Sequence, residues 1–128
     1  MKKLLAIVLA AVMAFGVFAF TGCSDKTGKS DFKVGAILIG DENEGYTYAH
    51  IQGIEAAKKA CNLSDDQIVY KYIVPENEKC YEAAIDLVDQ GCKLIIANSF
   101  GHESYLIRAA GEHPDVIFCH ATGKTAAK

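Results

Sequence analysis

The stretch Phe32 to Ile39, FKVGAILI, is an almost unbroken run of apolar and β-branched residues of strand length. Because a strand with one wet face alternates apolar and polar residues, this run predicts a strand buried on both faces. The polar segment Gly40 to Gly45 predicts a loop. From about Tyr46 to Cys61 apolar residues recur at helical spacing. One face of this predicted helix carries His50, Ile54, Ala57 and Cys61.

The same alternation of strand and helix continues along the chain. Further helices are predicted over about 76–91 and 101–110, and Asn62 and Gly91 are expected to end the first two helices because both residue types tolerate left-handed backbone. Three βαβ units with short connections require parallel strands and right-handed crossovers. The predicted fold class is therefore α/β, a three-layer parallel sheet with helices on both faces. The remaining predicted strands are Gln67 to Val74, Lys93 to Ala97 and Asp115 to His120.

Two loops are candidates for a binding site. In sheets of this class ligands lie beyond the carboxyl ends of the strands, which places Gly40 to Tyr46 and Asn98 to Ser104 at the site. The first loop has three acids and an amide ahead of Tyr46, so it offers hydrogen-bond acceptors and an aromatic face. The alternative is a solvated acidic turn in which Tyr46 only packs.

The N-terminus has the order of an exported lipoprotein. Two lysines precede the apolar run Leu4 to Phe20, and Thr21-Gly22 leads to Cys23. This end resembles the bacterial lipobox, although Phe20 stands where that pattern usually has leucine. It predicts a lipoprotein signal peptide over 1–22, a lipidated Cys23 and a polar linker over 23–31. We expect a protein lipid-anchored on the extracytoplasmic face of the cell membrane, a permanent transmembrane helix being the alternative.

The charge balance argues against nucleic acid as a partner. The chain has 13 basic and 16 acidic residues. Removing Lys2 and Lys3 with the signal peptide would leave eleven basic residues against sixteen acidic ones, a net charge of about −5. A polyanion needs a basic stripe, and the lysines here are scattered.

Catalytic and metal chemistry find little support in the sequence. No GxSxG or phosphate-binding GxxxxGK[ST] motif is present. His50 is expected to be a hydrogen-bonded core histidine, and His102 to lie on a first helical turn facing the cleft, as a ligand contact or a surface residue. We predict no enzyme activity, no catalytic residue, no metal site and no cofactor.

Four cysteines remain besides Cys23. They lie far apart within apolar patterns and form no CxxC pair, so buried free thiols are favoured, with one disulfide or a metal site as alternatives. Cys119 and His120 are adjacent and would point to opposite faces of a strand. The four are Cys61, Cys80, Cys92 and Cys119.

An ordered set of segments resembles the basic membrane protein family, the substrate-binding lipoproteins of ABC transporters. Besides the lipobox these segments are KVGAILIG (33–40), GYTYAH (45–50), DQGCKLIIA (89–97), NSFG (98–101) and PDVIFCHATG (114–123). The family has the type I periplasmic-binding-protein fold, in which two α/β lobes close on a small ligand. The resemblance implies that 32–123 is part of an N-terminal lobe and 124–128 a tail.

The resemblance also implies a site and partners. Members that are nucleoside receptors stack the base on an aromatic ring of the first loop, here Tyr46, with Asp41 and Asn43 as polar contacts. The second loop would add Ser99, Phe100 and Ser104, although Ser104 stands where relatives often carry aspartate, which leaves a different ligand class open. The implied function is solute binding, with a nucleoside-like solute suspected, for ABC permease subunits.

The chain length bears on this function. A single lobe offers a ligand only half a cleft, so weak or absent binding is expected of this chain alone. We expect a truncated receptor that lacks its second lobe. The alternative is a single-lobe binding or interaction module that dimerises through the fourth strand, which would be an exposed edge.

Overall fold

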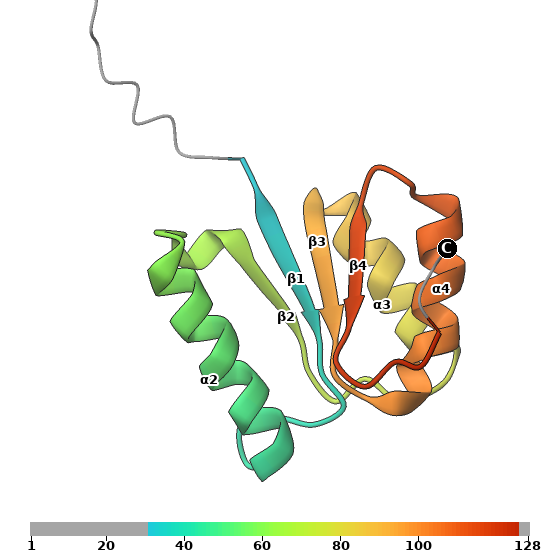
Figure 1. Cartoon of the computed structure of the whole chain (residues 1–128), viewed down its shortest axis with the longest axis horizontal. Helices are drawn as coiled ribbons and strands as arrows, with labels where there is room; N and C mark the ends of the chain where they lie inside the picture. Colours follow the sequence, from blue (N-terminus) through green and yellow to red (C-terminus); the bar gives the residue numbers. More distant parts are fainter. Residues whose placement is uncertain (1–30, 126–128) are drawn as a thin grey trace, which may run out of the picture. The chain divides into compact units, whose positions relative to one another are not determined.

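The structure, a computed structural model, describes residues 31–125 as a parallel sheet with helices between its strands (Figure 1). The strand order is β2-β1-β3-β4, and every neighbouring pair is parallel. This confirms the predicted α/β class. The elements are β1 (Lys33–Ile37), α2 (Gly45–Ala60), η1 (Asp65–Gln67), β2 (Ile68–Lys71), α3 (Glu78–Asp89), β3 (Cys92–Ala97), η2 (Phe100–His102), α4 (Glu103–Glu112) and β4 (Ile117–His120).

The core lies between the sheet and the pair α3 and α4. Ile37 and Ile95 face these helices and are fully buried with Leu87. Gly35 is needed in β1 because a Cβ there would lie 2.7 Å from Cδ1 of Leu87. The predicted continuous apolar strand is thus buried on both faces, and the helix layer packs directly on it.

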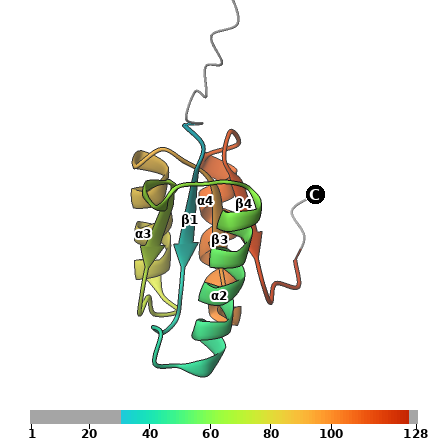
Figure 2. The same ribbon diagram turned by 90° about the vertical axis from the view of Figure 1, so that its left-hand side faces the viewer.

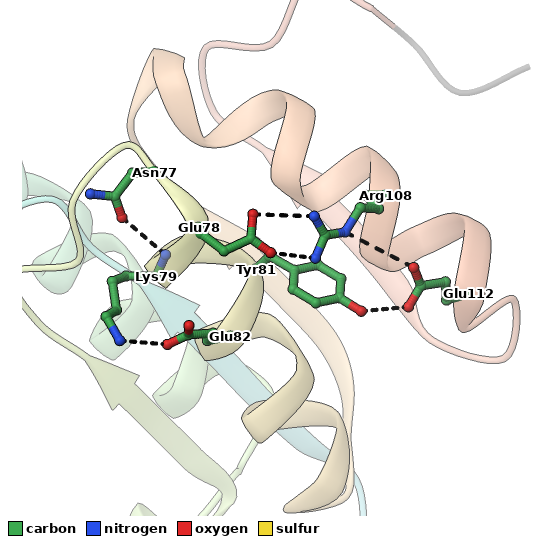
Figure 3. A network of polar contacts seen from close by, with 7 residues as sticks. All are labelled: Asn77, Glu78, Lys79, Tyr81, Glu82, Arg108 and Glu112. Carbon is green, nitrogen blue, oxygen red and sulfur yellow. Dashed lines mark hydrogen bonds and ion pairs between the residues drawn. The ribbon is translucent and has the colours of Figure 1, made fainter.

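Polar contacts join α3 to α4 on their outer surface (Figure 3). The guanidinium of Arg108 donates two hydrogen bonds to Glu78, at 2.5 and 3.2 Å, and lies 3.3 Å from the ring centroid of Tyr81. The Tyr81 hydroxyl donates to Glu112 at 2.6 Å. Two helices tied in this way form one unit behind the sheet.

Among residues 31–125, α2 is the helix that lies on the opposite face of the sheet (Figure 2). A helix is about 10 Å wide, whereas four strands span about 14 Å, so one helix leaves part of this face open. Ile117 of β4 is 61% exposed. A hollow of about 400 Å³ lies between α2 and the sheet. Its lining residues are Ala49, His50, Gly53, Ile54, Ala57 and Ile96.

The predicted apolar stripe of α2 is therefore not a core. His50 and Ile54 are half-buried, whereas Ala57 and Cys61 are exposed, and the one fully buried residue of the helix is Thr47. The stripe faces the sheet as expected, but nothing among residues 31–125 covers its far side. Helical periodicity predicted which face of α2 points to the sheet, but it did not predict how deeply that face is buried.

The second strand is shorter than predicted. It ends at Lys71 rather than Val74, because the chain then turns back onto the loop after β1. The N–H of Ile73 donates to the carbonyl of Gly40, at 3.1 Å. Ile73 has a φ of 54°, in the left-handed region that a β-branched residue rarely adopts, and its side chain is 66% exposed.

The helix ends agree better with the sequence. Asn62 and Gly91 adopt φ of 54° and 85°, which confirms the left-handed positions predicted after α2 and α3. The third helix was predicted to begin at Gly101. Instead the 3₁₀ turn η2 comes first, α4 begins at Glu103, and the helix continues to Glu112.

The four cysteines of the described region are free, which excludes the predicted alternative of a disulfide between them. Cys80 and Cys92 are buried, as predicted. Cys61 and Cys119 are exposed, contrary to prediction, because Cys61 follows the end of α2 and Cys119 lies on the open face of the sheet.

The predicted signal peptide (1–22) and lipidated Cys23 lie outside the described residues, as does most of the linker. Within residues 31–125, no helix is long and apolar enough to cross a membrane. The sheet has β2 and β4 as its edges, which confirms that the fourth strand is an edge strand.

Candidate functional site

The two loops selected from the sequence meet at the carboxyl edge of the sheet. The hydroxyl of Tyr46, in the first turn of α2, donates a hydrogen bond to the backbone carbonyl of Asn98 after β3, at 2.5 Å. The Tyr46 side chain remains 43% exposed. An aromatic ring is therefore presented at the edge where ligands of parallel sheets bind.

Asn98 connects the two loops through buried hydrogen bonds. It is fully buried, and its Oδ1 accepts the N–H of Ile39 at 2.9 Å while its Nδ2 donates to Oγ1 of Thr47 at 3.5 Å. Its own N–H donates to the carbonyl of Ile37, at 3.2 Å. The sequence offered one clue to this role, a polar residue directly after an apolar strand, but it did not indicate these partners.

The acidic first loop folds on itself. The carboxylate of Glu44 accepts the N–H groups of Tyr46 and Thr47, at 2.8 and 2.7 Å, and caps α2. These hydrogen bonds lower the pKa of Glu44, and the one from the Thr47 N–H has the largest effect. Asp41 Oδ1 accepts the N–H of Asn43, at 2.9 Å. Asp41 is half-buried and Asn43 is exposed, and these two predicted polar contacts belong to one tight turn that precedes α2.

A carboxylate from another segment holds the second loop. Glu76, between β2 and α3, accepts the Ser99 hydroxyl at 2.5 Å and the Gly101 N–H at 2.7 Å. The hydrogen bond from Ser99, followed by that from Gly101, lowers the pKa of Glu76. A Cβ on Gly101 would lie 2.5 Å from Cδ and 2.7 Å from Cβ of Glu76, so any larger residue there would have to displace Glu76. The sequence indicated Glu76 only as an acid in a first helical turn.

Phe100 and Ser104 complete the predicted residues of this loop. Phe100 is 55% exposed, and the Lys124 ammonium lies 4.9 Å from its ring centroid. Ser104 is exposed on the first turn of α4. The structure links Ser99 to the first loop through its neighbour Asn98, which accepts the Tyr46 hydroxyl, whereas the ring of Phe100 is contacted by Lys124 from the end of the described region.

His102 does not face the cleft, contrary to prediction. It is fully buried, and its Nε2 lies 2.9 Å from the carbonyl of Val74, to which it must donate because a carbonyl only accepts. Nδ1 is buried and has no hydrogen-bond partner among the described residues. Desolvation lowers the pKa of His102, so the ring is neutral at pH 7.

His50 is hydrogen-bonded, as expected, but it is not a core residue. It is half-buried, and its Nδ1 donates to the Tyr46 carbonyl at 2.9 Å. Its ring centroid lies 4.5 Å from that of Tyr46, with the planes at 59°. His50 therefore supports the exposed aromatic ring from the side of α2.

The site contains groups for recognition. Exposed aromatic faces, hydroxyls and carboxylates at one edge can stack on a planar ligand and accept its hydrogen bonds. In residues 31–125, no group of three or more His, Cys, Asp or Glu side chains is placed to hold a metal ion.

A second hollow lies between α4 and β4 and reaches the carboxyl end of β4. Its volume is about 310 Å³, and Leu106, Ile107 and Phe118 contribute apolar walls. Glu103 of the second loop and His120 also line it, whereas Tyr46 and Asn98 do not, so it is a competing location for a ligand.

Two solved structures have a fold similar to that of this chain. An ABC-transporter solute-binding protein from Conexibacter woesei DSM 14684 matches 68% of this chain and 28% of its own, with a TM-score of 0.57 and 20% identity. A transcriptional activator of the comK gene from Bacillus halodurans matches 75% of this chain and 32% of its own, with a TM-score of 0.64 and 21% identity. These likenesses establish the fold.

One curated protein is similar in sequence as well. A purine-binding protein from Brucella abortus (strain 2308) is 36% identical over 98 residues, which cover 73% of this chain. The chain spans about a quarter of the length of that relative, 27%. No family model matches the chain.

Proposed function

We propose that this chain is part of the solute-binding component of an ABC importer and binds a purine-like solute at the carboxyl edge of its sheet. The observation that carries the proposal is the exposed ring of Tyr46, held beside Asn98 at that edge. The likeness to a purine-binding protein and the solute-binding fold support it.

The physical reason is that a purine is flat, aromatic and rich in hydrogen-bonding groups. Stacking on Tyr46 would bury one face of the base, and the hydroxyl and carboxylate groups of the two loops could bond its edge. One lobe leaves the other face of the ligand in water. We therefore expect dissociation constants in the millimolar range for this chain alone, since most of the burial found in closed ligand sites would be missing.

Binding can be tested with adenosine as the probe, by saturation-transfer NMR on the purified chain. Tyr46→Ala should abolish the signal because it removes the stacking face. Tyr48→Ala is the matched control, since Tyr48 is equally exposed on the same helix. Equal binding by both variants would show that adenosine does not use this site.

The anchoring of the protein is a proposal of its own. We infer that Cys23 is acylated, that the protein is held on the extracytoplasmic face of the cell membrane, and that ABC permease subunits are its partners, as in the basic membrane protein family. The order of residues 1–30 supports this. Mass spectrometry of the membrane fraction should find an acylated Cys23 as the N-terminus, and an unmodified Met1 would contradict the inference.

A second candidate function is a module that dimerises through β4. The unpaired edge of that strand and the 61% exposure of Ile117 favour it. In that case Ile117→Lys would convert a dimer to a monomer in sedimentation analysis, whereas a wild-type monomer at about 100 μM would exclude this function.

A further inference from the structure

We propose that the Tyr46 hydroxyl and the Asn98 carbonyl form a clasp between the two loops, and that this clasp fixes the Tyr46 ring as a preformed stacking platform. The inference rests on the proposed function and adds a positioning role for two groups that do not themselves stack on the solute. The hydrogen bond that defines the clasp measures 2.5 Å.

The ring is held at both of its ends. At the backbone end, Glu44 accepts the Tyr46 N–H at 2.8 Å, which fixes the first turn of α2. At the far end, the hydroxyl is bound to Asn98. A tyrosine side chain has two rotatable torsions, so fixing both ends restricts the ring to one orientation.

The acceptor of the clasp cannot shift either. Asn98 is fully buried, its side-chain amide is bound to Ile39 and Thr47, and its backbone N–H is bound to Ile37. Three attachments, to β1, to the segment that follows it and to α2, hold its carbonyl in place. Asn98 is thus a positioning residue, because it acts on a ligand only through Tyr46.

The ring is also supported on one side. His50 lies 4.5 Å from it, centroid to centroid, yet 43% of the Tyr46 side chain stays exposed. A phenylalanine in this position would offer the same stacking area without the tether. The hydroxyl therefore contributes preorganisation, which lowers the entropy lost when a ligand orders the ring.

The test compares Tyr46→Phe with Tyr48→Phe, using adenosine as the probe. Both substitutions remove one phenol hydroxyl from α2, but the Tyr48 hydroxyl makes no hydrogen bond among the described residues. Tyr46→Phe should weaken adenosine binding by about three- to tenfold, the factor that corresponds to one hydrogen bond of ordinary strength. Tyr48→Phe should leave it unchanged, and the two variants should unfold at similar temperatures.

NMR of the Tyr46 ring tests the clasp directly, because it reports the orientation of the ring and not only the stability of the fold. In the free wild type, nuclear Overhauser contacts should connect the Tyr46 ring to Asn98, and they should weaken in Tyr46→Phe while the rest of the spectrum is kept. Wild-type affinity in Tyr46→Phe, with loss of binding in Tyr46→Ala, would overturn the clasp and leave the proposed site intact. Unchanged binding in Tyr46→Ala would overturn both.

Discussion

The imidazole of His102 donates a hydrogen bond from Nε2 to the backbone carbonyl of Val74, at 2.9 Å. This bond joins the turn η2 to the segment that leads from β2 to α3. That segment continues to Glu76, which holds Ser99 and Gly101, so the buried histidine is a second point at which the loop Asn98 to Ser104 is fixed to it.

Acid should destabilise the protein through His102. Desolvation lowers its pKa in the folded chain, whereas an unfolded histidine titrates near about 6.5. As the pH falls below that value the unfolded state binds a proton that the folded state does not, so the free energy of unfolding decreases, by at most about 1.4 kcal/mol per pH unit. Urea unfolding at pH 7.5, 6.5 and 5.5 measures this slope.

His102→Gln is the diagnostic variant for that slope. A glutamine amide can still donate to Val74 and does not titrate, so the decrease between pH 6.5 and 5.5 should become smaller. The non-titrating amide at position 102 keeps the hydrogen bond, so the comparison isolates the proton of His102. Identical slopes in the wild type and His102→Gln would show that another group is responsible.

Two glycine substitutions should change the free energy of unfolding in opposite directions. Gly35→Ala forces a methyl group to within 2.7 Å of the buried Leu87 side chain and should cost about 1–3 kcal/mol. Gly53→Ala meets nothing within 4 Å in the interior of α2 and should stabilise by about 0.5–1 kcal/mol. Chemical denaturation measures both.

The cost of Gly35→Ala should also depend on its neighbour. In a Leu87→Ala background the added methyl group has room, so the same substitution should cost at least about 1 kcal/mol less. Strict additivity of the two substitutions would place the strain elsewhere.

Thiol reactivity should divide the cysteines by burial. Cys61 and Cys119 are exposed and should react with iodoacetamide in the native protein. Cys80 and Cys92 are buried, and burial raises the pKa of Cys80 to about 12, so both should react only after unfolding. Peptide mapping after brief labelling distinguishes the two pairs, and rapid native labelling of Cys80 would contradict the described core.

The charge of the ligand should matter at the proposed site. Glu44 and Glu76 have lowered pKa values, so both are ionised at pH 7, and they already accept N–H groups that could otherwise bind an anion. We expect adenosine monophosphate to bind about fivefold more weakly than adenosine at low salt, with the difference shrinking in 0.5 M NaCl.

Glu76→Gln tests the source of this difference. Glutamine can still accept the hydrogen bonds from Ser99 and Gly101 but carries no charge. The difference in affinity between adenosine and adenosine monophosphate should therefore become smaller. Glu112→Gln, at the far end of α4, should leave this difference unchanged. Equal affinity of the wild type for both ligands at low salt would refute the electrostatic argument.

Local patterns were sufficient to predict the order of the elements and the two loops at the carboxyl edge of the sheet. The continuous run at β1 and the left-handed residues Asn62 and Gly91 depend on neighbours in sequence, and they were confirmed. The partners of Asn98 and Glu76 come from segments more than twenty residues away, and no local pattern encodes them. His102 was misplaced because the 3₁₀ turn changes the direction that a regular helix would give its side chain.

The most direct test of the proposed site is a titration of the isotope-labelled chain with adenosine, followed by amide chemical shifts. We expect saturable shifts with a dissociation constant of about 1–10 mM, largest at Tyr46 and across Asn98 to Gly101. Shifts confined to Leu106 and Phe118, in the hollow between α4 and β4, would contradict it. So would the absence of any saturable shift at the two loops.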